Sequence, residues 1–129
     1  MTLPLRLIFQ FIFQEEHILS SAYSSTKPYI TWHGTRIAKP DFSQNSHTLA
    51  FTLTHPGFGE KLHIILNAYW EALDFELPML KSPLLWHRIS DTYLDSPDDF
   101  CEPDGSPALN ERFYRVQPRS SVILMAMVG

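Results

Sequence analysis

The chain has 129 residues, of which 44% are hydrophobic and 13% aromatic, and this length suits a single domain with one core. The composition lies far from the charge-rich, aromatic-poor profile of disordered proteins, so we expect a folded chain. A net charge of -4, with basic residues scattered singly, argues against a nucleic-acid partner.

The first residues predict a short amphipathic helix followed by a linker. Apolar side chains recur at the i, i+3, i+4, i+7 and i+8 spacing of one helix face, and Pro4 suits the first turn. These positions are Leu5, Ile8, Phe9, Ile12 and Phe13. The run is too short to span a bilayer and acidic residues follow it closely, so we expect neither a membrane span nor a signal segment. We divide the chain into residues 1–28, helix and linker, and residues 29–129, the folded domain.

Residues 29–129 carry strand patterns separated by turns rich in Pro, Asp and Gly. The expected strands are Tyr29 to Trp32, Thr48 to Thr54, Leu62 to Leu66, Leu73 to Leu77, Trp86 to Thr92, Phe113 to Gln117 and Ser121 to Val128. The last is a continuous apolar run, which is typical of a strand buried on both faces. Short strands at this spacing predict an all-β fold, an antiparallel β-sandwich. A partly open barrel stays as the alternative, because spacing does not reveal strand order.

The stretch from Asn67 to Glu71 joins two strongly alternating runs and permits two interpretations. In the first, Glu71 is a catalytic acid beside an aromatic substrate platform. In the second, the stretch is the corner of a β-hairpin between the strands Leu62 to Leu66 and Leu73 to Leu77. We favour the hairpin, because an exposed corner makes a poor acid and no second carboxylate stands in a fixed relation to Glu71.

The other polar residues show no pattern of a catalytic or metal site. The histidines are scattered, without a two-His or His-Glu-x-x-His arrangement. Cys101 is the single cysteine, and no nucleophile signature surrounds it. Because it has no disulfide partner, we expect a cytoplasmic location.

The acidic stretch from Asp95 to Asp104 lacks calcium-loop spacing, so it predicts a turn whose side chains accept hydrogen bonds from its own backbone amides. Asp74 and Glu76 alternate with apolar residues, so they should face water. We expect no metal and no cofactor.

Exposed aromatic side chains are candidate carbohydrate contacts, because sugar rings stack on Trp and Tyr. The aromatic residues considered are Tyr29, Trp32, Trp70, Trp86 and Tyr93. The competing interpretation is packing in the core or between sheets, which is the commoner role of Trp and Tyr in small sandwiches. We retain Trp32, Trp70 and Trp86 as candidate sugar contacts.

Several segments stand in a characteristic order between residues 29 and 128. They are Ile30 to Gly34, Lys39 to Ser43, Ser46 to Leu53, Leu66 to Pro78, Trp86 to Thr92, Ser96 to Asp99 and Tyr114 to Ser120. In this order they resemble the segment after the catalytic barrel in bacterial glycogen-debranching enzymes of the isoamylase type, within the α-amylase superfamily of glycoside hydrolases. Phe42 and Ala72 depart from the family pattern, where we expect Trp and Pro. Residues 1–28 match the end of the last barrel helix only loosely.

The resemblance implies a Greek-key β-sandwich of the α-amylase C-terminal type, which in such enzymes is an accessory domain packed against a (β/α)8 barrel. It also implies that the catalytic carboxylates belong to the barrel, whose motifs do not occur in this sequence. We therefore expect a fragment that is not an enzyme on its own, with residues 1–28 as a candidate remnant of the barrel's end.

Three hypotheses for the function follow from this resemblance. The first is a non-catalytic accessory domain that stabilises or orients a catalytic domain in glycogen or α-glucan metabolism. The second is a free-standing α-glucan-binding module, with Trp32, Trp70 and Trp86 as candidate contacts. The third is the small subunit of a split debranching hydrolase. The expected partners are a catalytic barrel, a weakly bound α-glucan, or a second copy through an exposed apolar face, with no nucleic acid and no membrane.

Overall fold

The computed structural model describes residues 27–43, 46–57 and 59–129. The helix expected near the N-terminus lies outside these residues. The described chain is nearly all β, as the alternating patterns predict. Its strands are β1 (Tyr29–His33), β2 (Thr48–His55), β3 (Glu60–Asn67), β4 (Leu73–Glu76), β5 (Leu84–Asp91), β6 (Ala108–Leu109), β7 (Phe113–Val116) and β8 (Ser120–Val128), with a 3-10 turn, η2, at Pro103–Gly105. Within these ranges no helix is long and apolar enough to cross a membrane.

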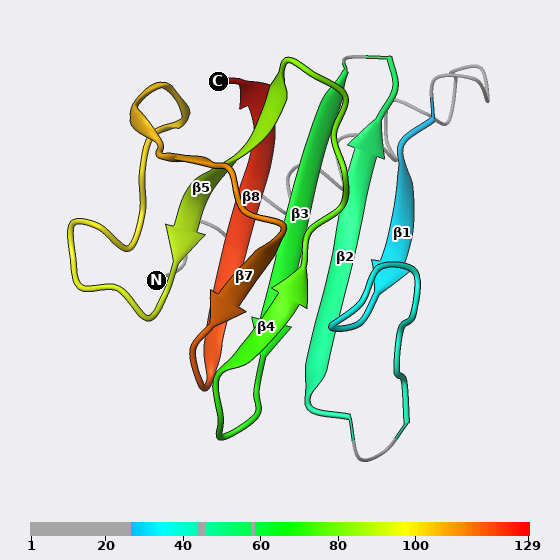
Figure 1. Cartoon of the computed structure of the whole chain (residues 1–129), viewed down its shortest axis with the longest axis vertical. Helices are drawn as coiled ribbons and strands as arrows, with labels where there is room; N and C mark the ends of the chain where they lie inside the picture. Colours follow the sequence, from blue (N-terminus) through cyan, green and yellow to red (C-terminus); the bar gives the residue numbers. More distant parts are fainter. Residues whose placement is uncertain (1–26, 44–45, 58) are drawn as a thin grey trace.

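The strands form two antiparallel sheets. The larger has six strands in the order β1-β2-β3-β8-β5-β6, and the smaller pairs β4 with β7. In Figure 1, β4 and β7 cross in front of the larger sheet. The C-terminal strand β8 returns between β3 and β5, so strands distant in sequence become neighbours, as in Greek-key connections. The antiparallel sandwich is confirmed. The barrel alternative is wrong, because the larger sheet stays open, with β1 and β6 at its two ends.

The expected hairpin across residues 67–71 is also wrong. β3 pairs with β2 and β8, whereas β4 pairs with β7 in the other sheet. Residues 68–72 therefore carry the chain from the larger sheet to the smaller one. Alternation on both flanking strands is equally compatible with a hairpin and with two facing sheets, because a period of two fixes the buried face but not the partner strand.

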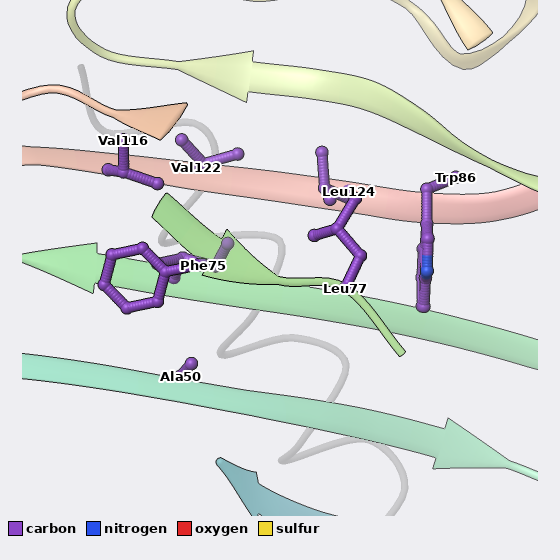
Figure 2. Packing of buried hydrophobic residues seen from close by; sticks show 8 residues of the cluster. Ala50, Phe75, Leu77, Trp86, Val116, Val122 and Leu124 are labelled. Carbon is purple, nitrogen blue, oxygen red and sulfur yellow. The ribbon is translucent and has the colours of Figure 1, made fainter. Parts of the chain in front are cut away.

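Separate apolar clusters lie on the two faces of the six-stranded sheet. We call the side toward β4 and β7 the inner face. Its cluster, shown in Figure 2, comprises Ala50, Ile65, Phe75, Leu77, Trp86, Val116, Val122 and Leu124. The opposite side, the outer face, carries Leu53, Leu62, Ile64, Ile89 and Ile123. Because β8 contributes Val122 and Leu124 to one cluster and Ile123 to the other, its continuous apolar run is buried on both faces, as predicted.

Candidate functional site

The crossing between the sheets is held by the side chain of Asn67, at the end of β3. Its Nδ2 donates to the carbonyl oxygens of Glu71, Val116 and Gln117 at 3.0, 3.1 and 3.2 Å. Its Oδ1 accepts from the backbone N–H of Tyr69 at 3.0 Å. Asn67 is buried, and its side-chain amide provides hydrogen-bond partners for backbone groups of the crossing segment and of the end of β7. The segment that first suggested an active site is thus a structural junction.

The two carboxylates of β4, Asp74 and Glu76, are held by structural partners. Asp74 is exposed and pairs with Arg115 at 3.2 Å. Glu76 accepts from the backbone N–H of Ile37 at 2.9 Å and pairs with Arg112 at 3.3 Å. The Ile37 hydrogen bond, ahead of the Arg112 contact, lowers the pKa of Glu76, so its carboxyl group is ionised at neutral pH. A carboxyl group in this state has no proton to deliver as a general acid.

Asp91, at the end of β5, is a buried carboxylate with a structural role that the sequence pattern did not indicate. Its Oδ2 accepts from the Tyr114 hydroxyl at 2.5 Å, and its Oδ1 accepts from the backbone N–H of Tyr93 at 3.1 Å. Burial, followed by the hydrogen bond to Asp91, raises the pKa of Tyr114, so the phenol keeps its proton and continues to donate. This pair ties β5 to β7, and so one sheet to the other.

Two of the scattered histidines meet in the core. The backbone N–H of Ala38 donates to His33 Nδ1 at 2.8 Å, so the His33 proton is on Nε2, which lies 3.1 Å from the Thr52 hydroxyl. That hydroxyl therefore donates to His63 Nδ1, 2.9 Å away. The His63 proton is then on Nε2, a buried atom with no hydrogen-bond acceptor among the described residues. This chain joins β1, β2 and β3 and needs both imidazoles neutral.

The buried histidine predicts a stability that falls with acidification. Burial, and then the nearby His33, lower the pKa of His63 from 6.5 to about 3. Below about pH 6.5 this histidine binds a proton in the unfolded chain but stays neutral in the folded chain. The free energy of unfolding should therefore fall by about 1 kcal/mol for each unit by which the pH is lowered. Urea titrations between pH 7.5 and 4.5 measure this slope. His63→Leu should reduce the slope and the exposed-site control His47→Gln should keep it; an unchanged slope in His63→Leu contradicts the assignment.

Two groups of neighbouring aromatic rings differ in geometry. At the sheet junction, the His47 and Tyr69 rings stack at 5.9 Å with an angle of 21°, and Trp70 lies 5.4 Å from Tyr69. Trp70 is 65% exposed. At the β1 edge, Trp32 meets Phe42 edge-on, at 5.6 Å and 80°. In the first group the Trp70 ring is mostly open to solvent, whereas in the second the Trp32 and Phe42 rings make an edge-to-face contact.

Trp86, the third tryptophan retained from the sequence, is a core residue. It is 4% exposed, and its Nε1 donates to the carbonyl oxygen of Pro78 at 2.8 Å. A pocket of about 390 Å³ lies beside it, lined mainly by leucines with Asn110, Glu111 and Arg112 as its polar members. The pocket contains one carboxylate rather than a pair, so it does not provide the two groups that glycoside hydrolysis needs.

The remaining candidate ligands do not converge within the part of the chain that the structure describes. There, no group of three or more His, Cys, Asp or Glu side chains is placed to hold a metal ion. Asp98 N–H donates to the carbonyl oxygen of Asp95 at 2.8 Å, which closes the turn expected in the acidic stretch. Cys101 is a half-buried free thiol whose backbone N–H pairs with Ile89.

The described domain matches known proteins in sequence. A family model described as "Isoamylase 1-3, C-terminal" matches residues 31–124. Isoamylase 3, chloroplastic, from Oryza sativa subsp. japonica is 33% identical over 97 residues, covering 75% of this chain and 12% of that protein. Isoamylase SU1, chloroplastic, from Zea mays is 31% identical over 111 residues, covering 78% of this chain and 14% of that protein. These matches confirm the resemblance to isoamylases, and the chain spans less than a sixth of either relative's length.

A solved structure of a MutB mutant in complex with the substrate sucrose matches at a TM-score of 0.40 and 23% identity, over 67% of this chain and 14% of that chain. A likeness at this level carries no argument.

Proposed function

Because the chain belongs to the isoamylase C-terminal domain family, we propose that it serves as the non-catalytic accessory domain of an enzyme that hydrolyses α-1,6 branches in glycogen or a related α-glucan. The observation that carries the proposal is the family match over residues 31–124, which covers nearly all of the described sandwich. Its role is to stabilise or orient a catalytic domain, either within one polypeptide or as a separate subunit.

The local environment of the carboxylates supports the non-catalytic part of this proposal. Asp74, Glu76 and Asp91 each have a structural partner, and Glu71 is exposed at the sheet junction. Retaining and inverting glycosidases need one carboxyl group that keeps its proton beside a second that is ionised. Of these four carboxyl groups, Asp74 and Glu76 form ion pairs, Asp91 accepts hydrogen bonds and Glu71 lies in solvent.

A chimera tests the accessory role. The chain replaces the matching C-terminal region of a plant isoamylase, and release of reducing ends from glycogen is compared among the chimera, the truncated isoamylase and this chain alone. We expect the chimera to keep its activity at temperatures that inactivate the truncated enzyme, and this chain alone to release none. Turnover by this chain alone would overturn the non-catalytic assignment; a chimera no more stable than the truncated enzyme would overturn the stabilising role.

A second candidate function, contact with an α-glucan, is favoured by the rings at the sheet junction. His47 and Tyr69 are nearly parallel, and Trp70 projects beside them with most of its surface exposed. An exposed indole such as Trp70, supported by neighbouring rings, suits stacking against the C–H face of a pyranose. Trp32, held edge-on to Phe42, is the weaker candidate, and Trp86 is excluded from the platform by its burial.

Trp70→Ala is expected to weaken maltooligosaccharide binding roughly five- to ten-fold, since loss of one stacking ring costs about 1 kcal/mol. Isothermal titration of the wild type and the variant measures the effect. Trp32→Ala is the matched control, because it removes an indole from the other aromatic group and should change the affinity less than two-fold. Absence of binding heat with the wild type, or equal losses of affinity in both variants, would overturn the proposed α-glucan contact.

A further inference from the structure

The turn between β7 and β8 holds one residue in an uncommon backbone conformation. Arg119 has a φ of 53°, in the left-handed region, where glycine or asparagine is the usual occupant of a turn. Pro118 precedes it and Ser120 begins β8. A residue with a side chain carries a conformational cost in this region, and residues that bear such a cost are concentrated at functional sites. The conformation of Arg119 therefore suggests a role for its side chain.

The guanidinium group of Arg119 is exposed and has no hydrogen-bond or ion-pair partner among the described residues. Arg112 and Arg115, in contrast, each pair with a carboxylate of β4. The backbone of Arg119 is held in place, because its N–H donates to the carbonyl oxygen of Tyr69 at 3.2 Å. The fold thus fixes the base of this side chain and leaves its charged end available to a ligand.

A pocket of about 400 Å³, which we call the Arg119 pocket, lies at the junction of the two sheets. Its described lining consists of residues 66–68, Thr92 and residues 119–121, and Arg119 is the charged member of this lining. The Thr92 hydroxyl oxygen accepts from the backbone N–H of Ser121 at 2.9 Å, so the hydroxyl hydrogen is left to donate. The guanidinium group offers further donors and no acceptor. The pocket therefore suits a ligand with closely spaced acceptor oxygens.

The Arg119 pocket adjoins the exposed ring of Trp70. In Figure 1 the turn after β7 and the segment that crosses between the sheets lie at the same end of the sandwich, where the Arg119 N–H meets the Tyr69 carbonyl oxygen. Ala68, in the pocket lining, is two residues from Trp70, so their Cα atoms are at most about 7.6 Å apart. An exposed ring beside a group of hydrogen-bond donors matches a pyranose, which has a C–H face and hydroxyl oxygens. A free anion would use the donors but not the ring.

We propose that the Arg119 pocket binds the hydroxyl groups of the sugar unit next to the one that stacks on Trp70, with Arg119 as the residue that determines specificity. This inference rests on the proposed α-glucan contact and adds a second subsite to it. Two adjacent subsites need at least two linked sugar units. An oligosaccharide therefore gains affinity from Arg119, whereas a single glucoside stacked on Trp70 does not.

Arg119→Gly tests the second subsite and preserves the fold, because glycine adopts a positive φ without strain. The full-length chain is titrated with maltoheptaose and with methyl α-glucoside, and binding is followed by the NMR signals of the indole N–H groups. We expect the maltoheptaose affinity to fall roughly ten-fold and the glucoside affinity to change less than two-fold. Urea titration should show that the variant is at least as stable as wild type. Arg115→Ala, the control for loss of one positive charge, should change either affinity less than two-fold.

The outcomes distinguish this inference from the proposed function. If wild type does not bind maltoheptaose, or if Trp70→Ala binds it as tightly as wild type, the α-glucan contact is wrong and the second subsite with it. If Trp70→Ala loses affinity while Arg119→Gly keeps it, or if Arg119→Gly weakens both ligands equally, only the second subsite is wrong. Inorganic phosphate is the remaining probe: if it binds more tightly than maltoheptaose and Arg119→Gly abolishes that binding, the pocket is an anion site and the sugar assignment is overturned.

Discussion

Phe75→Ala is expected to lower the free energy of unfolding by about 3–5 kcal/mol. The Phe75 side chain is fully buried and lies between the sheets, beside Val116 and Val122 (Figure 2). It is the main apolar side chain of β4, a strand of four residues whose pairing is to β7. Such a short strand is held by side-chain burial rather than by a long ladder of hydrogen bonds, so the cavity would loosen the whole smaller sheet.

Urea denaturation followed by tryptophan fluorescence measures this loss. Asp74→Ala is the matched control on the same strand, because Asp74 is exposed and its ion pair with Arg115 contributes about 1 kcal/mol or less. If Phe75→Ala costs no more than the control, the two-stranded sheet is not an integral layer of the fold.

The strands of this domain were predictable because their alternation is strong, but the strand partners were not. Leu62, Ile64 and Leu66 alternate on β3 and share the outer face, while Phe75 and Leu77 belong to the inner cluster. The sequence shows two apolar faces separated by a short turn-like segment, which also describes a hairpin. What assigns them to different cores is the pairing of β3 with β8, a contact between residues about 60 positions apart that no local pattern reports.

The polar contacts inside the fold were missed for a similar reason. His63 comes directly after Leu62, as a polar residue does in any half-buried alternating strand. Nothing near it in the sequence indicates that Thr52 and His33 complete a hydrogen-bonded chain with it. The side chain of Asn67 gave a weak signal, since Asn at a strand end often bonds its own backbone two residues on, as it does here with Tyr69. Its contacts to Val116 and Gln117 depend on tertiary structure.

The segments that carry the family resemblance prove to be the ones that hold the sandwich together. His33 belongs to the buried hydrogen-bonded chain, and the adjacent Gly34 is needed because a Cβ there would collide with the carbonyl oxygen of Lys39. Asn67 lies in another such segment, and Asp91 in a third. These residues are therefore explained by the fold of an accessory domain, and none of them requires a catalytic role.

Asn67→Asp is expected to cost about 3–5 kcal/mol at pH 7, more than Asn67→Ala, although it changes a single nitrogen to oxygen. In the native chain the amide nitrogen donates to three carbonyl oxygens at 3.0 to 3.2 Å. A carboxylate in the same place donates nothing, carries a charge and faces those oxygens in a site that is 1% exposed. Asn67→Ala leaves the carbonyl groups unpaired but adds no charge, so about 2–3 kcal/mol is expected.

The pH dependence separates this mechanism from simple loss of packing. Burial among carbonyl oxygens raises the pKa of an aspartic acid at position 67 above its unfolded value of about 4, so the folded variant binds more protons than the unfolded chain above that pH. The difference in unfolding free energy between Asn67→Asp and wild type should therefore shrink as the pH falls toward 4, while that of Asn67→Ala stays constant. Comparison with wild type at each pH cancels the shared contribution of His63. Asn110→Asp, at an exposed position, should match wild type throughout; a deficit in Asn67→Asp that does not change with pH would mean that the Asn67 amide does not donate to these carbonyl oxygens.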